Sequence, residues 1–119
     1  MAVSIFHIGL PLDQIPAEER AKIAKRLSDL QERMTRAGYK YEIIHASPET
    51  GLEGFKQQLR TQPCDGVLIG GGVVGDPAMS YFMEQIVDAT HAVVPKAKIM
   101  FYNHSVDVRE IVERWFGSS

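Results

Sequence analysis

The sequence predicts an α/β domain whose four strands form one parallel sheet, in the strand order 2-1-3-4, with helices packed on both faces. Short runs of β-branched and other apolar residues alternate along the chain with longer segments whose apolar residues recur at helical spacing. A helix between consecutive strands requires those strands to pair in parallel, through right-handed crossovers. No linker, repeat or shift in composition interrupts the 119 residues, so we expect a single domain over residues 1–119.

Two strands and the helix between them are expected in the first part of the chain. Residues 3–8 are an apolar run closed by Gly9, which is typical of a strand buried on both faces. Pro16 and the acids after it open a long amphipathic helix that ends at Gly38. Residues 39–46 alternate in polarity, which favours a more exposed strand at the edge of the sheet.

The remaining elements continue this alternation. Ser47 and Pro48 have the pattern of an N-cap and a first helical residue, in a helix that ends near Thr61. Residues 66–69 form a short buried strand that runs into three glycines, and Asp76 is placed to cap the next helix. The last strand, over residues 98–102, precedes a helix that Ser105 or Asp107 can cap and whose inward-facing residues are Val108, Ile111, Val112 and Trp115.

Composition and charge exclude several classes of partner. The 13 basic and 15 acidic residues give a net charge of −2, which offers no positive surface for a nucleic acid. The single cysteine, Cys64, cannot form an internal disulfide, so a reducing compartment is expected. The chain shows neither the pattern of a signal peptide nor an apolar run long enough to span a bilayer. We therefore expect a cytoplasmic protein that binds neither nucleic acid nor membrane.

The predicted strand order indicates where a ligand should bind. The chain reverses direction between the first and third strands, and ligands of open parallel sheets bind beyond the carboxyl ends of the strands at that point. Two segments, 9–14 and 70–76, border this crevice. Their expected ligand contacts are Gly9, Asp13, Gly71, Gly72 and Asp76. The two carboxylates could bind a hydroxylated ligand or a hydrated Mg²⁺, or they could serve only as caps.

Residues 70–75 match the pattern GxGxxG of dinucleotide-binding proteins. In those proteins the pattern follows the first strand, and an acid about 20 residues later binds the ribose. Here the pattern follows the third strand, and no acid at the end of a later strand is placed to bind a ribose. We therefore expect no cofactor. The alternatives are a tight turn and an anion site in which the amides of Gly71 and Gly72 bind a phosphate or carboxylate.

Three histidines, His7, His45 and His104, come at or near the carboxyl ends of predicted strands. His104 is the preferred acid/base group because it follows the fourth strand beside the glycine turn, where Asn103 could orient a ligand. His7 is either a second catalytic group or a neutral, hydrogen-bonded core histidine. His45 and His104 would lie roughly 14 Å apart, so the three cannot share one ion and we expect no metal site.

The stretch Pro63-Cys64-Asp65-Gly66-Val67-Leu68-Ile69-Gly70 is similar to the start of a central strand in flavodoxin-like and response-regulator-like domains. With four strand–helix units placed, nearly the whole chain resembles a stand-alone flavodoxin-like domain shortened to four strands. The resemblance implies a three-layer α/β/α sandwich and no particular activity. Gly70-Gly71 stands where a response regulator has its phosphorylatable aspartate, and Gly9-Leu10-Pro11-Leu12 stands where a flavodoxin has its phosphate loop.

These observations favour the binding of a small anionic molecule. The ligand would carry a phosphate or carboxylate, and His104 with His7 would exchange protons in a cofactor-free isomerase, lyase or hydrolase. The alternative is a non-catalytic module that senses a ligand or assembles with itself or a partner. Core packing of their helix does not explain the apolar residues Met79 and Tyr81, which favours a homodimer.

Overall fold

The structure, a computed structural model, describes residues 2–117 and contains one parallel sheet of four strands. The strands are β1 (Ser4–Gly9), β2 (Lys40–His45), β3 (Gly66–Ile69) and β4 (Lys98–Phe101). Their order is β2-β1-β3-β4, with parallel pairing throughout. The predicted fold class and strand order are therefore confirmed, and the predicted edge strand is at an edge.

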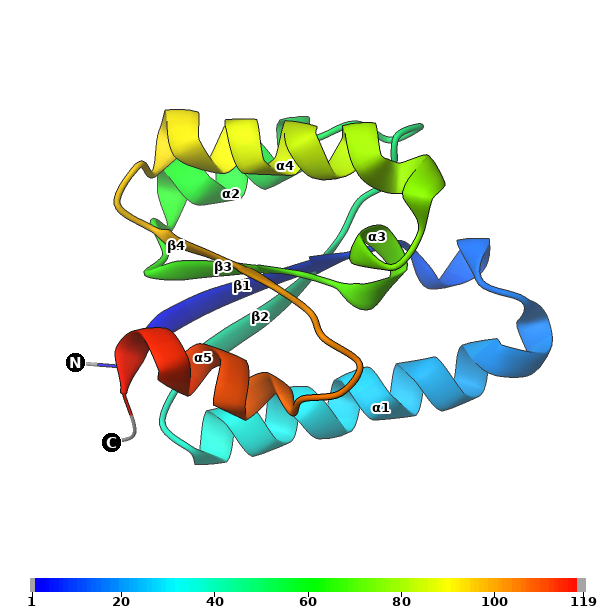
Figure 1. The fold of residues 1–119 in the computed structure, drawn as a ribbon, viewed down its shortest axis with the longest axis horizontal. Coiled ribbons are helices and arrows are strands. Elements are labelled where there is room, and N and C mark those ends of the chain that lie inside the picture. Colours follow the sequence, from blue (N-terminus) through cyan, green and yellow to red (C-terminus); the bar gives the residue numbers. More distant parts are fainter. Residues whose placement is uncertain (1, 118–119) are drawn as a thin grey trace.

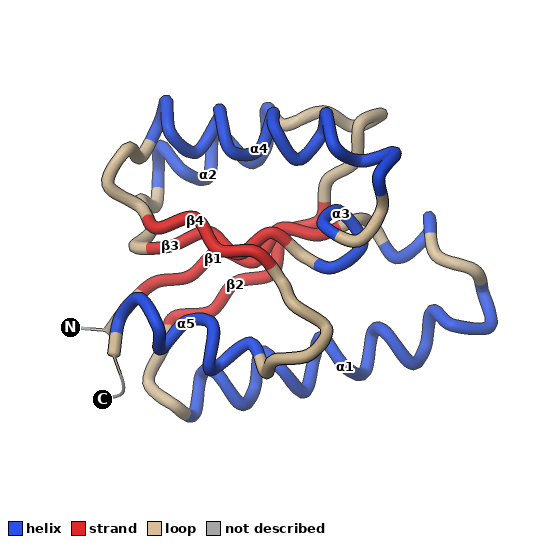
Figure 2. Tube along the Cα trace, viewed as in Figure 1, coloured by secondary structure: helices blue, strands red, loops and turns tan. Residues whose placement is uncertain are grey.

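Helices cover both faces of the sheet and make a three-layer sandwich. Figure 1 shows α1 (Ala17–Arg36) and α5 (Val108–Phe116) on one face, and α2 (Glu53–Thr61) and α4 (Ser80–Val93) on the other. The tube in Figure 2 shows the sheet between these two helical layers. Each layer buries its own apolar cluster against the sheet, and β1 and β3 contribute to both clusters. No helix within residues 2–117 is long and apolar enough to cross a membrane.

The register of the strands aligns side chains in rows across the face that α1 and α5 cover. Alternate residues of a strand point to opposite faces, and one row on this face contains Ile43, His7, Leu68 and Met100. The next row toward the carboxyl ends continues the register through two backbone hydrogen bonds, from Gly70 to Ile8 and from Tyr102 to Ile69. That second row contains His45, Gly9, Gly70 and Tyr102.

The prediction of a helix from Ser47 is wrong, because α2 begins only at Glu53. Ser47 and Thr50 close a turn instead: the Ser47 amide donates to the Thr50 hydroxyl at 2.9 Å, and the Thr50 amide donates to the Ser47 hydroxyl at 3.2 Å. Gly51 follows with a φ of 76°, a conformation that no right-handed helix contains. Side-chain hydrogen bonds of serine and threonine thus replaced the expected first helical turn.

Two predictions in the second half of the chain also need correction. The segment after Asp76 is a single 3-10 turn, η2 (Pro77–Met79), and α4 begins at Ser80; before it, Gly71–Val74 forms a short helix, α3, that was not predicted. Trp115 does not point inward: it is 52% exposed, and the Lys98 ammonium lies 5.7 Å from its ring centroid. Phe116 packs against the core of this layer in its place.

Candidate functional site

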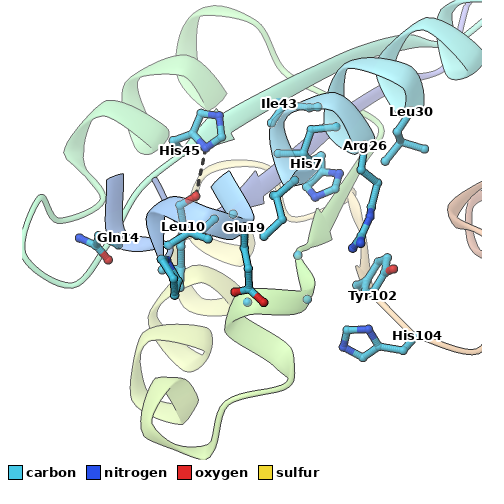
Figure 3. Close-up of a pocket in the computed structure, with 18 residues that line it drawn as sticks. His7, Leu10, Gln14, Glu19, Arg26, Leu30, Ile43, His45, Tyr102 and His104 are labelled. Carbon is cyan, nitrogen blue, oxygen red and sulfur yellow. Dashed lines mark hydrogen bonds between the residues drawn. The ribbon is translucent and has the colours of Figure 1, made fainter. Parts of the chain in front are cut away.

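A cavity of about 400 Å³ lies between α1 and the carboxyl ends of the strands, at the predicted point where the chain reverses direction (Figure 3). Its sheet side is formed by β1, β2 and the segments that follow β3 and β4. Its helix side is formed by α1 and by the segment after η1 (Leu12–Gln14). Six of the predicted site residues line it together: His7, Gly9, His45, Gly71, Gly72 and His104.

The cavity exists because two central positions of the sheet carry no side chain. Gly9 and Gly70 stand side by side in the last row, between His45 and Tyr102. A Cβ atom built on Gly9 would have no heavy atom within 4 Å, so Gly9 faces open space. A Cβ on Gly70 would lie 3.1 Å from Nε2 of His7. Glycine at Gly70 therefore leaves the imidazole edge uncovered, and glycine at Gly9 leaves the space beside it empty.

Helix α1 forms the apolar wall opposite these glycines. Figure 1 shows that the amino-terminal part of α1 extends beyond the carboxyl ends of the strands. Ile23, Leu27 and Leu30 recur at helical spacing and line the cavity. Leu30 is buried, whereas Ile23 and Leu27 are only half-buried. The apolar face of α1 thus packs in the core near its carboxyl end and forms a wall of the cavity nearer its amino end.

The glycines after β3 are required for space rather than for an unusual backbone. Within the described residues, the glycines with positive φ are Gly38, Gly51 and Gly117, and none of these is in the run. A Cβ on Gly71 would lie 2.8 Å from the Tyr102 ring and 3.3 Å from the His104 ring, and one on Gly72 would lie 3.3 Å from Leu10. The run therefore lets Tyr102, His104 and Leu10 close against α3.

His7 is buried in the sheet and is 5% exposed. Its Nδ1 lies 2.5 Å from the hydroxyl of Tyr41, and the two rings meet edge to face, with centroids 5.7 Å apart. The pKa of His7 is lowered to about 4, mainly by burial and to a smaller extent by the nearby charge of His45. His7 is therefore a neutral imidazole at neutral pH.

His45 and His104 are more accessible than His7. Nδ1 of His45 lies 3.2 Å from the carbonyl oxygen of Leu10, so the N–H at this position donates to it. This bond ties the end of β2 to the loop after β1. The His104 ring is exposed and meets Tyr102 edge to face, with centroids 4.9 Å apart. Figure 3 shows His104 at the cavity beneath Tyr102, where a bound molecule could reach it.

Three predicted site residues do not line this cavity. The Asp76 carboxylate accepts a hydrogen bond from the amide of Ala78 at 2.9 Å, which is the capping role considered as an alternative. Asn103 is occupied in the same way, since its side-chain oxygen accepts from the amide of Ser105 at 2.8 Å. Asp13 is exposed in η1 and lies outside the cavity lining. A ligand site built on Asp13, Asp76 or Asn103 has no support in this geometry.

Two charged residues of α1 that were not predicted as site residues, Glu19 and Arg26, also line the cavity. Glu19 and Arg26 are seven residues apart and share the helix face of Ile23 and Leu30. Arg26 has no ion pair within the described residues, where the salt bridges of α1 join Lys25, Arg33 and Arg36 to other acids. The sequence did contain a signal for these residues, because Glu19 and Arg26 recur at the same helical spacing as the apolar residues of α1. Tyr102 was also missed as a lining residue, although it ends the predicted fourth strand.

Comparisons of the chain with protein-family models, with curated proteins and with solved structures gave no significant match. Within residues 2–117, no group of three or more histidine, cysteine, aspartate or glutamate side chains lies close enough to hold a metal ion. The buried thiol of Cys64 has a pKa raised by burial to about 11 and lies outside the cavity lining. Any function must therefore be argued from the cavity and the side chains around it.

The pKa of His7 predicts how stability depends on pH. The folded chain holds this histidine neutral down to about pH 4, whereas the unfolded chain takes up the proton near pH 6.5. The stabilisation is fully present above pH 6.5 and is lost as the pH falls to about 4. We expect this group to remove about 3 kcal/mol from the free energy of unfolding over that interval. Urea denaturation at a series of pH values measures it.

Two variants isolate this effect. His7→Phe should flatten the fall in stability between pH 6.5 and 4, because the titrating group is gone. His91→Gln changes an exposed histidine in the last turn of α4 and should leave the slope as it is. A wild-type chain whose unfolding free energy is constant over this interval would contradict the assignment of a buried, neutral His7.

Proposed function

We propose that the cavity binds a small organic molecule with an apolar body and one phosphate or carboxylate group, and that His104 exchanges a proton with it. The observation that carries this proposal is the cavity itself, which brings three histidines and an arginine around an apolar space at the switch point of the sheet. Ligands of open α/β sheets bind at this position.

The size and walls of the cavity suit an organic ligand of metabolite size. Its volume of about 400 Å³ lies within the range of about 300–1,000 Å³ that is usual for ligand pockets. Most of the surface that lines the cavity is apolar. The polar side chains on the lining are those of His7, Gln14, Glu19, Arg26, His45, Tyr102 and His104. Such a cavity gains affinity from burial of the apolar body and specificity from a few polar contacts.

Arg26 supports an anionic group on the ligand. A guanidinium matches the geometry of a carboxylate or phosphate, and no salt bridge within the described residues involves Arg26. Figure 3 shows the side chain directed from α1 toward Tyr102. The amides of Gly71 and Gly72 on the cavity lining remain predicted partners for the same anion. A carboxylate or phosphate here would form charge-assisted hydrogen bonds with the guanidinium.

His104 supports a reaction rather than binding alone. It is exposed and lines the cavity, so a ligand atom and solvent can both reach its ring. Histidine exchanges protons near neutral pH, which suits a cofactor-free isomerase, lyase or hydrolase. A non-catalytic ligand sensor would use the same cavity without proton transfer, and turnover of a bound acid separates the two.

A second candidate function, assembly through an exposed surface, is favoured by Tyr81, which is 72% exposed on α4. Met79, expected beside it as a free apolar residue, is partly buried and packs against the core. The homodimer thus remains a prediction that depends on Tyr81. Sedimentation of the wild-type chain and of Tyr81→Ser over a range of concentrations measures it.

The ligand class predicts a dependence on chain length and on charge. Calorimetric titrations with butanoate, hexanoate and octanoate measure the effect of chain length. Each added methylene should strengthen binding about fourfold, because its burial contributes about 0.8 kcal/mol to the binding free energy. Hexanol should bind more weakly than hexanoate. Arg26→Gln should lower the affinity for hexanoate about tenfold and should change the affinity for hexanol little. Lys22→Gln, on the same helix but outside the cavity, is the control. Equal binding of hexanoate by both variants would contradict an anion site at Arg26.

Gly9 offers a second test, because a side chain there would occupy the cavity without displacing any atom within 4 Å of its Cβ. Gly9→Ala should weaken hexanoate binding moderately, and Gly9→Val should weaken it about tenfold or more, since the loss of two buried methylenes alone corresponds to about this factor. The melting temperature of both variants, measured in parallel, shows that the fold is intact. Undiminished binding by a folded Gly9→Val would place the ligand elsewhere.

A further inference from the structure

The buried pair of His7 and Tyr41 has a feature that core packing does not require. Tyr41 is in β2, the neighbour of β1, and is 5% exposed. Its hydroxyl bonds Nδ1 of His7 at 2.5 Å, on the side of the ring away from Gly70. The other ring nitrogen, Nε2, lies toward Gly70. His7 and Gly70 both line the cavity. The two nitrogens of one imidazole therefore have different surroundings.

The direction of the hydrogen bond between the two residues follows from their acidities. A neutral imidazole carries one N–H donor and one acceptor nitrogen, and a phenol can donate or accept. The phenol O–H is more acidic than a neutral imidazole N–H, and the imidazole nitrogen is the stronger base, so the favourable arrangement is O–H to N. Burial raises the pKa of Tyr41 and keeps the hydroxyl protonated. Among the described residues, Nδ1 is the hydrogen-bond partner of this hydroxyl.

With Nδ1 acting as acceptor, the ring proton of His7 is on Nε2. Within the described residues this nitrogen makes no hydrogen bond, and no buried polar side-chain atom there is left without a partner. Nε2 must therefore be in contact with the open space of the cavity. His7 thus presents a single N–H with no acceptor among the described residues to the cavity, where an acceptor atom of a bound molecule can take the hydrogen bond.

We propose that Tyr41 fixes His7 as the tautomer protonated at Nε2, and that this N–H binds a carbonyl oxygen of the ligand. The inference rests on the proposed function of the cavity and narrows its ligand class to oxo acids: molecules with an apolar body, an anionic group for Arg26 and a carbonyl oxygen for His7. Tyr41 touches no ligand and is a positioning residue. His7 supplies the hydrogen bond.

A neutral imidazole at His7 is a better hydrogen-bond donor for a ligand carbonyl than a charged imidazolium would be. The imidazole is uncharged at neutral pH, so it polarises the oxygen without a strong tendency to give up a proton. An N–H held in a fixed position stabilises negative charge that develops on that oxygen. A proton on the carbon next to the carbonyl would then be more acidic, and His104 on the same cavity is the base available to remove it.

The tautomer can be measured in the free protein by NMR with ¹⁵N-labelled histidine. In wild type at pH 7 we expect one His7 spin system, with Nε2 protonated and Nδ1 bare. Tyr41→Phe removes the donor and should convert this signal to a mixture of the two tautomers, whereas a variant that only loosened packing would leave the protonated nitrogen unchanged. A wild-type ring protonated at Nδ1 overturns the inference.

The ligand contact is tested with two probes of the same shape, 2-hexanone and 2-methyl-1-hexene, in which a methylene replaces the carbonyl oxygen. The Nε2 proton of His7 should shift on adding 2-hexanone and should shift little with the hydrocarbon. His7→Phe should lower the affinity for 2-hexanone about fivefold, because one neutral hydrogen bond is lost. The same variant should leave the affinity for the hydrocarbon unchanged.

The outcomes separate the two proposals. If hexanoate binds but 2-hexanone leaves the Nε2 proton unmoved, or if His7→Phe weakens both neutral probes equally, the cavity is a ligand site and the carbonyl assignment is wrong. If neither hexanoate nor 2-hexanone binds to wild type, the proposed function fails and this inference fails with it.

Discussion

Gly9 and Gly70 lie side by side at the carboxyl ends of the two central strands, and the space above them shapes this end of the molecule. Elsewhere on this face the strands present side chains such as Ile5, Leu68 and Met100, which pack against the helices. Above these two glycines α1 has no side chain to meet. It therefore spans a cavity, with Ile23 and Leu27 left half-buried along it. Such a loss of packing costs a fold that is stabilised by burial, and under the proposed function a bound ligand would restore it.

The same two glycines determine the chemistry of His7. The ring is buried by the sheet and the helix, so its charged form is disfavoured. Gly70 leaves one nitrogen open to the cavity, while Tyr41 occupies the other. His104 lies on the same cavity in an exposed position, packed over Gly71. Two histidines on one cavity thus have different surroundings, because His7 is buried and bonded to Tyr41 whereas His104 is exposed.

The sheet and the place of the cavity at its carboxyl end were predictable, because strand composition and helical spacing report burial directly and parallel topology leaves few arrangements. His7, His104 and the glycines were found for that reason. Tyr41 was not found as a site residue, since its role depends on the register that places it beside His7. Asp76 and Asn103 do not line the cavity, and their side chains bond nearby backbone amides, as short polar side chains near turns commonly do. Arg26 was missed because the length by which α1 extends past the sheet is a tertiary feature.

A crystal structure of the protein grown with hexanoate would show where the ligand binds. We expect the acyl chain to lie over Gly9 and Gly70, against Ile23 and Leu27, with the carboxylate within hydrogen-bonding distance of Arg26. An α1 that packs directly on the sheet and leaves no cavity would contradict the account. So would a cavity that contains only water while hexanoate binds elsewhere.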